Sequence, residues 1–213
     1  MDAAFKKVDY AMTQLNGRTC LITGASSGLG AHFARTLSAA GFRLVLAARR
    51  LDRVQALAEE LRAAGGGAFP VAMDVSDEKS VASAFDVAES AFGTVDTVIA
   101  NAGVSAPGRS TEIRVESMRS VLDTNVLGVL LTAREGARRM IAAGSTENER
   151  GRIVLIGSIT AEMTGQGETI YSASKAAVAH LGRNLAKEWA RLGVNVNVIQ
   201  PGYIQTELSG DWF

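Results

Sequence analysis

The sequence is poor in cysteine and histidine, and these shortages argue against a disulfide and against a metal site. Cys20 is the sole cysteine among 213 residues, so no disulfide can form within the chain, and its place in an apolar run predicts an inert, buried thiol. The two histidines, His32 and His180, each fall inside a predicted helix without a second ligand at metal-site spacing. We therefore predict no metal site and assign both histidines to structural or surface positions.

An excess of charge and long apolar runs are also missing. Lysine plus arginine equals aspartate plus glutamate, 22 residues each, and a zero net charge gives no support to a nucleic-acid or anionic-membrane partner. No apolar run approaches the roughly 18 residues that a transmembrane helix needs. The first nine residues lack the apolar core and the small-residue cleavage site of a secretory signal. These absences predict a cytoplasmic protein with neither a membrane nor a nucleic-acid partner.

What the sequence does contain is a regular alternation of two patterns. From Gly17 onward, short apolar runs typical of buried strands alternate with longer helical segments. Strands are predicted at 19–23, 42–48, 68–73, 95–100, 152–157 and 194–199. Helices are predicted from a glycine-rich turn to residue 40, and at 52–64, 77–91, 115–143 and 169–192. This alternation predicts an α/β protein, a doubly wound parallel sheet (Rossmann fold) with helices on both faces and strand order 3-2-1-4-5-6.

The chain shows no repeat or shift in composition, so we expect one folded domain, residues 17–213, after an extension at 1–16. The extension has apolar residues at helical spacing, namely Phe5, Val8, Met12 and Leu15. A short amphipathic helix and a frayed tail both fit this extension. Within the domain, residues 145–150 are predicted to be a polar connecting loop.

The turn after the first strand is rich in glycine. Gly24, Gly28 and Gly30 allow a tight turn and a close approach of the backbone to a ligand, and the free N–H groups of the following helix suit a pyrophosphate. The spacing is Gly-x-x-x-Gly-x-Gly, whereas the common dinucleotide fingerprint is Gly-x-Gly-x-x-Gly. A plain strand–turn–helix connector is the alternative, and three glycines at this place argue against it.

A tyrosine and a lysine four residues apart form the candidate catalytic pair. On a helix, Tyr171 and Lys175 share one face, and a neighbouring cation lowers the phenol pKa from about 10 toward the range useful for proton transfer. Ser158 follows the buried strand 152–157, where its hydroxyl can donate to a substrate oxygen. Taken alone, the pair usually marks a solvated helix face and is weak evidence for catalysis.

These motifs occur together and in a fixed order. They are Thr23-Gly24-x-x-x-Gly28-x-Gly30, Asn101-Ala102-Gly103, Asn125, Ser158, Tyr171-x-x-x-Lys175 and Pro201-Gly202. In this order they resemble the short-chain dehydrogenase/reductase family of the compact, single-domain type, which includes 3-oxoacyl reductase-like enzymes and other ketone/alcohol oxidoreductases. The resemblance covers residues 17–208 and implies an oxidoreductase that works on a small carbonyl or alcohol substrate as a homodimer or homotetramer.

The resemblance also implies roles for the catalytic residues. Tyr171 would be the general acid/base, Lys175 would lower its pKa and hold the nicotinamide ribose, and Ser158 would orient the substrate oxygen. Asn125 would keep a water in a proton relay from Lys175. The alternative for Asn125 is a solvent-facing helix residue, which fits poorly in the apolar run 126–131.

A larger set of residues is implied to bind the cofactor. Asn101-Ala102-Gly103 would border it, and Asp74-Val75 would contact the adenine, with a helix cap as the competing role for Asp74. The segment after Pro201 would face the nicotinamide. The full implied set is Gly24, Ser26, Ser27, Gly28, Leu29, Gly30, Arg49, Asp74, Val75, Asn101, Ala102, Gly103, Tyr171, Lys175, Pro201, Gly202, Ile204 and Thr206.

The end of the second strand favours NADP(H) over NAD(H). Ala48 stands where NAD-type members of the family carry aspartate, and Arg49 follows it. A carboxylate would repel a 2′-phosphate, whereas an arginine binds it through charge-assisted hydrogen bonds. Ser27 stands where many NADP members have a basic residue, and Arg50 is predicted to be a solvated charge at a helix start.

The sequence departs from the family after Leu208, where five residues remain. The family continues through a substrate-covering segment, another helix and a seventh strand, so either the natural chain is longer or the protein lacks most of that covering segment. We expect a longer natural chain, because an exposed edge on the sixth strand would favour aggregation. The residues expected near the substrate are Ser105, Met163, Gln166 and Tyr203. The rival hypothesis is a non-catalytic cofactor-binding or scaffold protein on the same fold. A dehydratase or epimerase fits less well, because those larger relatives carry a different glycine spacing.

Overall fold

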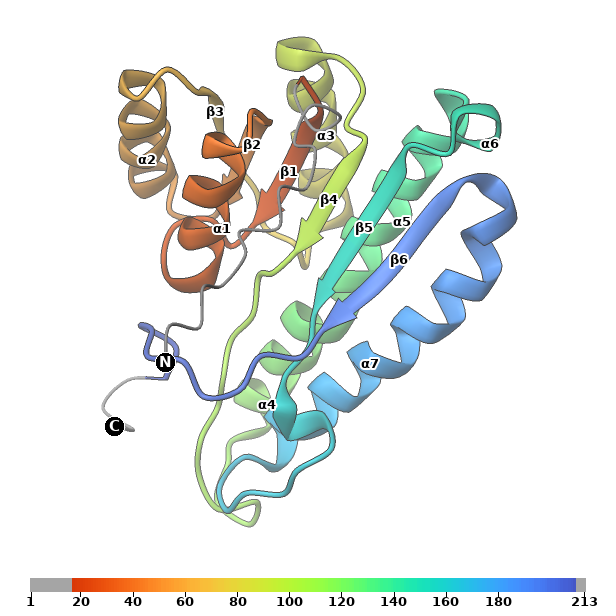
Figure 1. The fold of residues 1–213 in the computed structure, drawn as a ribbon. Helices are drawn as coiled ribbons and strands as arrows, with labels where there is room; N and C mark the ends of the chain where they lie inside the picture. The colour runs from red at the N-terminus through yellow and green to blue at the C-terminus, as the bar shows by residue number, and fades with distance from the viewer. Residues whose placement is uncertain (1–16, 210–213) are drawn as a thin grey trace, which may run out of the picture.

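The computed structural model describes residues 17–209, so the extension at 1–16 lies outside the described residues. Six strands form one sheet in the order β3-β2-β1-β4-β5-β6, with every neighbouring pair parallel (Figure 1). The strands are β1 (Thr19–Thr23), β2 (Arg43–Ala48), β3 (Gly67–Ala72), β4 (Thr97–Ala100), β5 (Gly151–Ile156) and β6 (Val194–Ile199). The predicted doubly wound parallel sheet and its strand order are confirmed.

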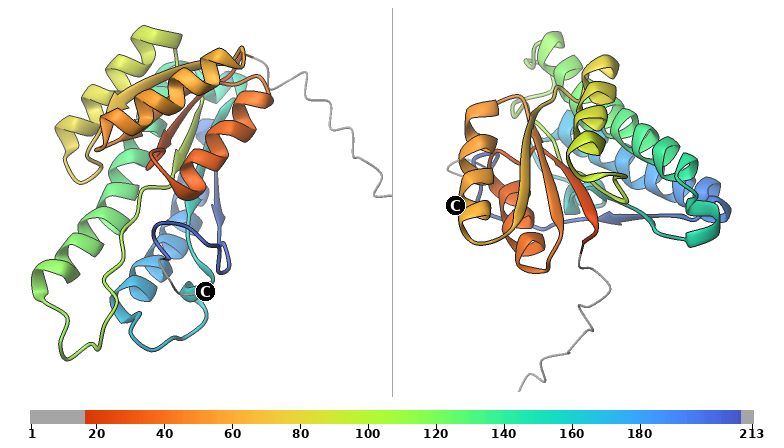
Figure 2. Two further views of the ribbon diagram at one scale, coloured as in Figure 1. Left: turned by 90° about the vertical axis from the view of Figure 1, so that its left-hand side faces the viewer. Right: turned by 90° about the horizontal axis from the view of Figure 1, so that it is seen from above.

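Helices cover both faces of the sheet, because the strands bury apolar side chains on both sides. One face packs against α1 (Gly28–Ala39) and α2 (Leu51–Ala63). The other packs against α3 (Glu78–Phe92), α5 (Gly128–Ala142) and α7 (Thr169–Trp189), as the three views of the ribbon show (Figures 1 and 2). Each of these helices is amphipathic and turns its apolar side to a strand. None of the helices within 17–209 is long and apolar enough to cross a membrane.

The buried cysteine fits this core. Cys20 lies on β1 and is completely enclosed on the face of α1 and α2. Burial in apolar surroundings raises the pKa of its thiol far above the ordinary value, and the Asp96 charge raises it further. Because the thiolate is the reactive form, a raised pKa makes this sulfur inert.

The predicted helix 115–143 is interrupted. It consists of α4 (Val115–Leu122), a π-helical turn at Asp123–Leu127, and α5. The wider turn places Asn125 completely inside the protein. Directly after it, a Cβ on Gly128 would lie 2.6 Å from Val75 Cγ2, so only glycine allows the start of α5 to pack against the segment that follows β3.

The connector at 145–150 also differs from the prediction. It contains a one-turn helix, α6 (Ser145–Asn148), rather than a loop throughout. The Ser145 hydroxyl is buried and donates to the Leu192 carbonyl oxygen at 2.6 Å. The turn is therefore tied to the end of α7, a contact between distant segments that a polar composition does not reveal.

All six strands end at one edge of the sheet, because all run in the same direction. The loops after β4 and β5 extend beyond this edge, and after β6 the chain turns back across it toward α1 and α2 (Figures 1 and 2). Thr206 in the returning segment lies 3.3 Å from where a Gly28 Cβ would stand. In open α/β sheets, ligands bind in the crevice outside these carboxyl ends.

Candidate active site

A cavity of about 440 Å³ lies at the carboxyl edge of the sheet. It is lined by the turns that follow β1 to β5, by the first turns of α7 and by the returning segment after β6. The predicted site residues that line it are Gly24, Ser26, Ser27, Gly28, Leu29, Arg49, Asp74, Val75, Asn101, Ala102, Gly103, Ser158, Tyr171, Lys175, Pro201, Gly202, Ile204 and Thr206. Gly30 and Asn125 belong to the predicted set but do not line the cavity.

The glycine-rich turn forms one end of the cavity. Gly24 and Gly28 have positive φ angles of 66° and 53°, which glycine adopts without strain. A Cβ on Gly30 would lie 2.3 Å from the Gly24 carbonyl oxygen, so this glycine allows α1 to pack against the turn. Ser27 precedes α1 and makes no side-chain cap, which leaves the first N–H groups of the helix open to a phosphate.

Hydrogen bonds of Asn101 join the ends of β1 and β4 beside this turn. The Thr23 hydroxyl accepts hydrogen bonds from the backbone N–H groups of Asn101 and Ala102, both at 3.0 Å. The Asn101 side-chain amide donates back to the Thr23 carbonyl oxygen at 3.0 Å. These bonds fix the backbone on which Gly103 borders the cavity.

Asn125 does not line the cavity, but its amide group forms hydrogen bonds behind the cavity wall. Its Oδ1 accepts from the Val104 N–H at 2.8 Å, and its Nδ2 donates to the Val104 carbonyl oxygen at 2.9 Å and to the Ser174 hydroxyl at 3.0 Å. Its amide therefore joins the loop after β4 to α7. The prediction of an interior position is met, and the side chain does not face solvent.

Three polar side chains meet at the inner end of the cavity. Tyr171 and Lys175 lie one turn apart on α7, with the lysine Nζ 5.6 Å from the centre of the tyrosine ring. The ammonium is buried and donates to the Ile156 carbonyl oxygen at 2.8 Å. Ser158, which follows β5, is close enough to the Tyr171 phenol for its hydroxyl to lower the pKa of that phenol. A carbonyl oxygen between these two hydroxyls would meet two hydrogen-bond donors.

The pKa values in this cluster follow from burial. Burial raises the pKa of Tyr171, the Ser158 hydroxyl acts to lower it, and the Glu168 charge raises it further. Burial lowers the pKa of Lys175 to about 8. The expectation that Lys175 brings the tyrosine pKa below its ordinary value is not met in this structure, because desolvation of the phenolate is the larger effect.

Arg49 and Asp74 line the cavity where β2 and β3 end. The Asp74 carboxylate accepts from the N–H and the hydroxyl of Ser76 at 3.0 and 2.7 Å, which lowers its pKa, and the Arg49 charge adds a smaller effect in the same direction. The cap of α3 is Asp77, whose side chain accepts from the Lys79 N–H. The competing role of Asp74 as a helix cap is therefore wrong.

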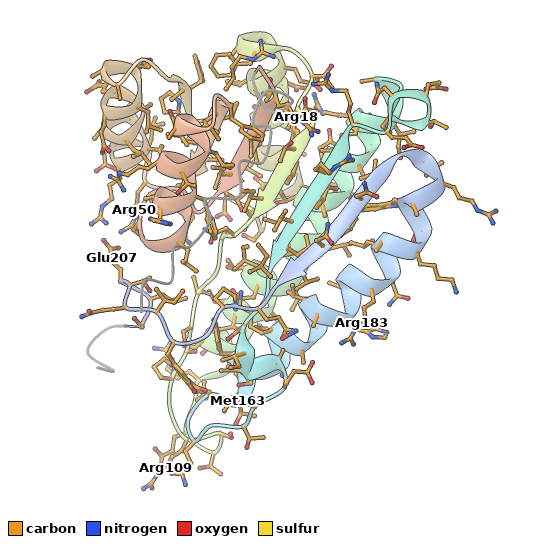
Figure 3. The ribbon with its side chains drawn as sticks, in the orientation of Figure 1. Arg18, Arg50, Arg109, Met163, Arg183 and Glu207 are labelled. Atoms are coloured by element: carbon orange, nitrogen blue, oxygen red, sulfur yellow. The ribbon has the colours of Figure 1, made fainter. Side chains whose placement is uncertain are left out.

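Arg50 is exposed at the start of α2, as predicted, but its guanidinium also has partners that the sequence did not indicate. It donates to the hydroxyls of Ser26 and Ser27 in the glycine-rich turn at 3.0 and 3.1 Å. It also pairs with Glu207 at 3.1 Å, and Figure 3 shows these two side chains facing each other. Arg53 holds the other oxygen of the same carboxylate at 2.6 Å. The returning segment is thus attached to the start of α2.

The substrate end of the cavity was predicted in part. Ser105 and Tyr203 line the cavity, whereas Met163 and Gln166 do not. Met163 follows the one-turn 3-10 helix Ile159–Ala161 and points away from the body of the protein (Figure 3).

Thr160 and Glu168 line the cavity and were missed by the sequence reasoning. Glu168 precedes Tyr171 by three residues and Lys175 by seven, a helical spacing that could have identified it. Thr160 lies two residues after Ser158, inside the short 3-10 helix, and no spacing in the sequence marks it. Within 17–209, no three His, Cys, Asp or Glu side chains gather into a metal-holding group.

The motif order and this geometry can be compared with known proteins. The sequence pattern of the short chain dehydrogenase family matches residues 18–213. This chain is a short-chain dehydrogenase. It is 34% identical over 194 residues to the 3-oxoacyl-[acyl-carrier-protein] reductase of Bos taurus, covering 91% of this chain and 78% of the relative. It is 40% identical over 194 residues to the cis-4-hydroxycyclohexanecarboxylate dehydrogenase of Sinomonas cyclohexanicum, with 90% and 75% covered.

Solved short-chain dehydrogenases share the fold as well. A gluconate 5-dehydrogenase from Burkholderia cenocepacia J2315, solved with NADP and tartrate, superposes with a TM-score of 0.87 at 31% identity, over 94% of this chain and 78% of that one. Other similar chains were solved with NAD or NADH. The protein is therefore an oxidoreductase of this family for alcohol- or ketone-type substrates, and similar members bind NAD or NADP.

Proposed function

We propose that this short-chain dehydrogenase interconverts a ketone or aldehyde and the corresponding alcohol with NADP(H), and that Tyr171 transfers the proton. The observation that carries the proposal is the meeting of Ser158, Tyr171 and Lys175 in one cavity whose far end holds the glycine-rich turn and Arg49. The open N–H groups at the start of α1 fit a pyrophosphate. Gly24 and Gly28 let the turn that carries them pack closely against Ala102 and Thr206.

In the reducing direction, NADPH, when bound, would supply the hydride that the carbonyl carbon takes up. The Ser158 hydroxyl donates a hydrogen bond to the carbonyl oxygen and fixes its position. Tyr171 donates its phenolic proton to that oxygen, which becomes the alcohol, and takes a proton from solvent afterwards. In the oxidising direction Tyr171 accepts the alcohol proton. The buried Lys175 ammonium stabilises negative charge on the phenol oxygen during either transfer.

The NADP(H) preference rests on the end of β2. Ala48 offers no carboxylate to repel a 2′-phosphate, and Arg49 is exposed at the cavity rim. Arg50 lies beside the hydroxyls of Ser26 and Ser27, and its charge is paired with Glu207. The Arg49 guanidinium suits the 2′-phosphate that NAD lacks.

The test is the substitution Tyr171→Phe, which removes the phenol oxygen and keeps the ring. We expect kcat for ketone reduction with NADPH to fall at least about 100-fold, because a proton donor contributes roughly 10²–10⁴. NADPH binding, followed by nucleotide fluorescence, should change less than about threefold. Unchanged turnover of Tyr171→Phe would contradict the mechanism. NADPH binding without turnover of any carbonyl by the unaltered protein would favour the rival, a non-catalytic cofactor-binding or scaffold protein.

We propose a homodimer or homotetramer as the working form. Leu122 precedes the π-helical turn and Leu127 ends it, and they are 42% and 45% exposed, which is high for leucine. A mass from light scattering equal to that of one chain at micromolar concentration would contradict this proposal.

A further inference from the structure

Glu168 is a buried acid that the mechanism above does not use. It is only 9% exposed, and its Oε2 atom is enclosed and has no hydrogen-bond partner within residues 17–209. It occupies the N-cap position of α7, where the shorter side chains of Ser, Thr, Asp and Asn commonly accept from the free N–H groups of the helix. The Glu168 side chain makes no such cap. The Glu168 carboxylate therefore does not bind the N–H groups at the start of α7.

The carboxylate belongs to the catalytic cavity. Glu168 lines the cavity on the helix face that also carries Tyr171 and Lys175. It is near enough to the phenol for its charge to raise the pKa of Tyr171. A Cβ on Gly165 would lie 2.6 Å from Oε2, so the missing side chain at Gly165 makes the room that the carboxylate occupies.

An enclosed carboxylate oxygen without a donor is unfavourable, because it has lost water and gained nothing in return. Lys175 does not supply a donor, since its Nζ is directed to the Ile156 carbonyl oxygen. Among the described residues, no arginine, lysine or histidine forms an ion pair with Glu168. The Ser172 hydroxyl, one turn further along α7, is the other enclosed side-chain oxygen without a partner among the described residues. It makes no hydrogen bond to Glu168 and, unlike Glu168, does not line the cavity. A ligand in the cavity is therefore the donor that we assign to the carboxylate.

The chemistry of the cavity limits what that donor can be. The Lys175 ammonium lies in the same cavity and disfavours a substrate that brings a second positive charge. A substrate carboxylate at this place would be repelled by Glu168. A neutral hydroxyl satisfies the acid without meeting either repulsion.

We propose that Glu168 determines substrate specificity by accepting a hydrogen bond from a hydroxyl group next to the reacting carbon. The substrate is then a hydroxy ketone, and the product of its reduction is a vicinal diol. This inference rests on the proposed function, because it places the reacting oxygen between Ser158 and Tyr171. One helical turn separates Tyr171 from Glu168, which suits two oxygens on adjacent carbons.

The test compares two ketones that differ by one hydroxyl, 3-hydroxy-2-butanone and 2-butanone, each reduced with NADPH and, in parallel, with NADH. For the unaltered protein we expect kcat/KM to be about tenfold or more higher for the hydroxy ketone. In Glu168→Ala the ratio should fall to about one, mainly through KM for the hydroxy ketone. Glu168→Gln keeps the shape and one acceptor oxygen and should retain an intermediate ratio, which decides the matter where the alanine variant fails to fold.

A pH profile separates this role from a purely structural one. Removing the Glu168 charge should move the pH dependence of kcat/KM to lower pH in both variants, because that charge raises the pKa of Tyr171. Equal kcat/KM for the two ketones in the unaltered protein, or a preference that survives in both variants, would overturn the inference and leave the proposed function standing. No reduction of either ketone with either cofactor would overturn the proposed function together with this inference.

Discussion

Thr160 donates two hydrogen bonds to the oxygen of Ser158, one from its backbone N–H at 3.2 Å and one from its hydroxyl at 3.0 Å. Both residues are buried. With its acceptor positions used, the Ser158 hydroxyl has its own hydrogen free to donate toward Tyr171 or a substrate oxygen. Two donated bonds also polarise this hydroxyl and strengthen the bond that it donates.

We expect Thr160→Val to lower kcat for carbonyl reduction about three- to tenfold, because it removes one hydrogen bond worth about 0.5–1.5 kcal/mol and keeps the volume. Thr160→Ser keeps the hydroxyl and should retain most of the activity. NADPH affinity should be the same in both variants, since Thr160 acts through Ser158. Steady-state kinetics with one ketone at saturating NADPH measures the effect. Full activity of the valine variant would show that Ser158 needs no such support.

The cofactor preference can be tested at the end of β2 with a matched pair of variants. Arg49→Ala should weaken NADPH binding about 10- to 100-fold, because a charge-assisted contact is worth roughly 1.5–3 kcal/mol. Its NADH binding should hardly change. Ala48→Asp should reverse the preference, since the new carboxylate repels a 2′-phosphate and accepts from a ribose hydroxyl. Fluorescence titrations with both nucleotides measure all four affinities. An equal loss for NADH and NADPH in Arg49→Ala would contradict this assignment of Arg49.

Lys175 predicts a dependence of stability on pH. Its pKa is lowered to about 8 by burial, whereas a lysine in the unfolded chain titrates at about 10.4. Between these values the unfolded chain binds more protons than the folded protein, so the free energy of unfolding rises with pH through this window. Relative to Lys175→Met, the unaltered protein should gain up to ~3 kcal/mol between pH 8 and pH 10.4.

Urea unfolding of both proteins at several pH values measures this difference. Taking the difference between the two proteins cancels the titration of groups that they share, including Cys20 and Tyr171. A difference that stays constant from pH 7.5 to 10.5 would show that Lys175 keeps its ordinary pKa in the folded protein.

The sheet was predictable because each strand carries its own local signal. The apolar runs of β1 and β5 are bounded by glycine, and their alternation with helices permits few parallel arrangements. The π-helical turn at Asp123–Leu127 was not predictable, because it follows from the burial of Asn125 against Val104. Likewise, α6 is held by a hydrogen bond from Ser145 to Leu192, 47 positions away.

The candidate site also contains residues that could be predicted from the sequence and residues that could not. Tyr171, Lys175 and the glycines were identifiable because their chemistry needs fixed spacings along the chain. The partner of Arg50 was not predictable, because Glu207 lies 157 residues away and only the folded chain brings the two together. Met163 was misjudged because nearness in sequence to Ser158 does not determine on which side of a short loop a side chain emerges.

The junction of β1 and β4 is the place where two consecutive parts of the chain meet. Strands β1 to β3 come from the first third of the chain and β4 to β6 from the remainder, and three residue pairs, Cys20–Thr97, Leu21–Val98 and Ile22–Ile99, join them within the sheet. The bonds between Thr23 and Asn101 continue this junction to the cavity. A ligand in the cavity contacts both parts of the chain. Its binding therefore stabilises the packing of the two parts against each other, by an amount that grows with ligand concentration.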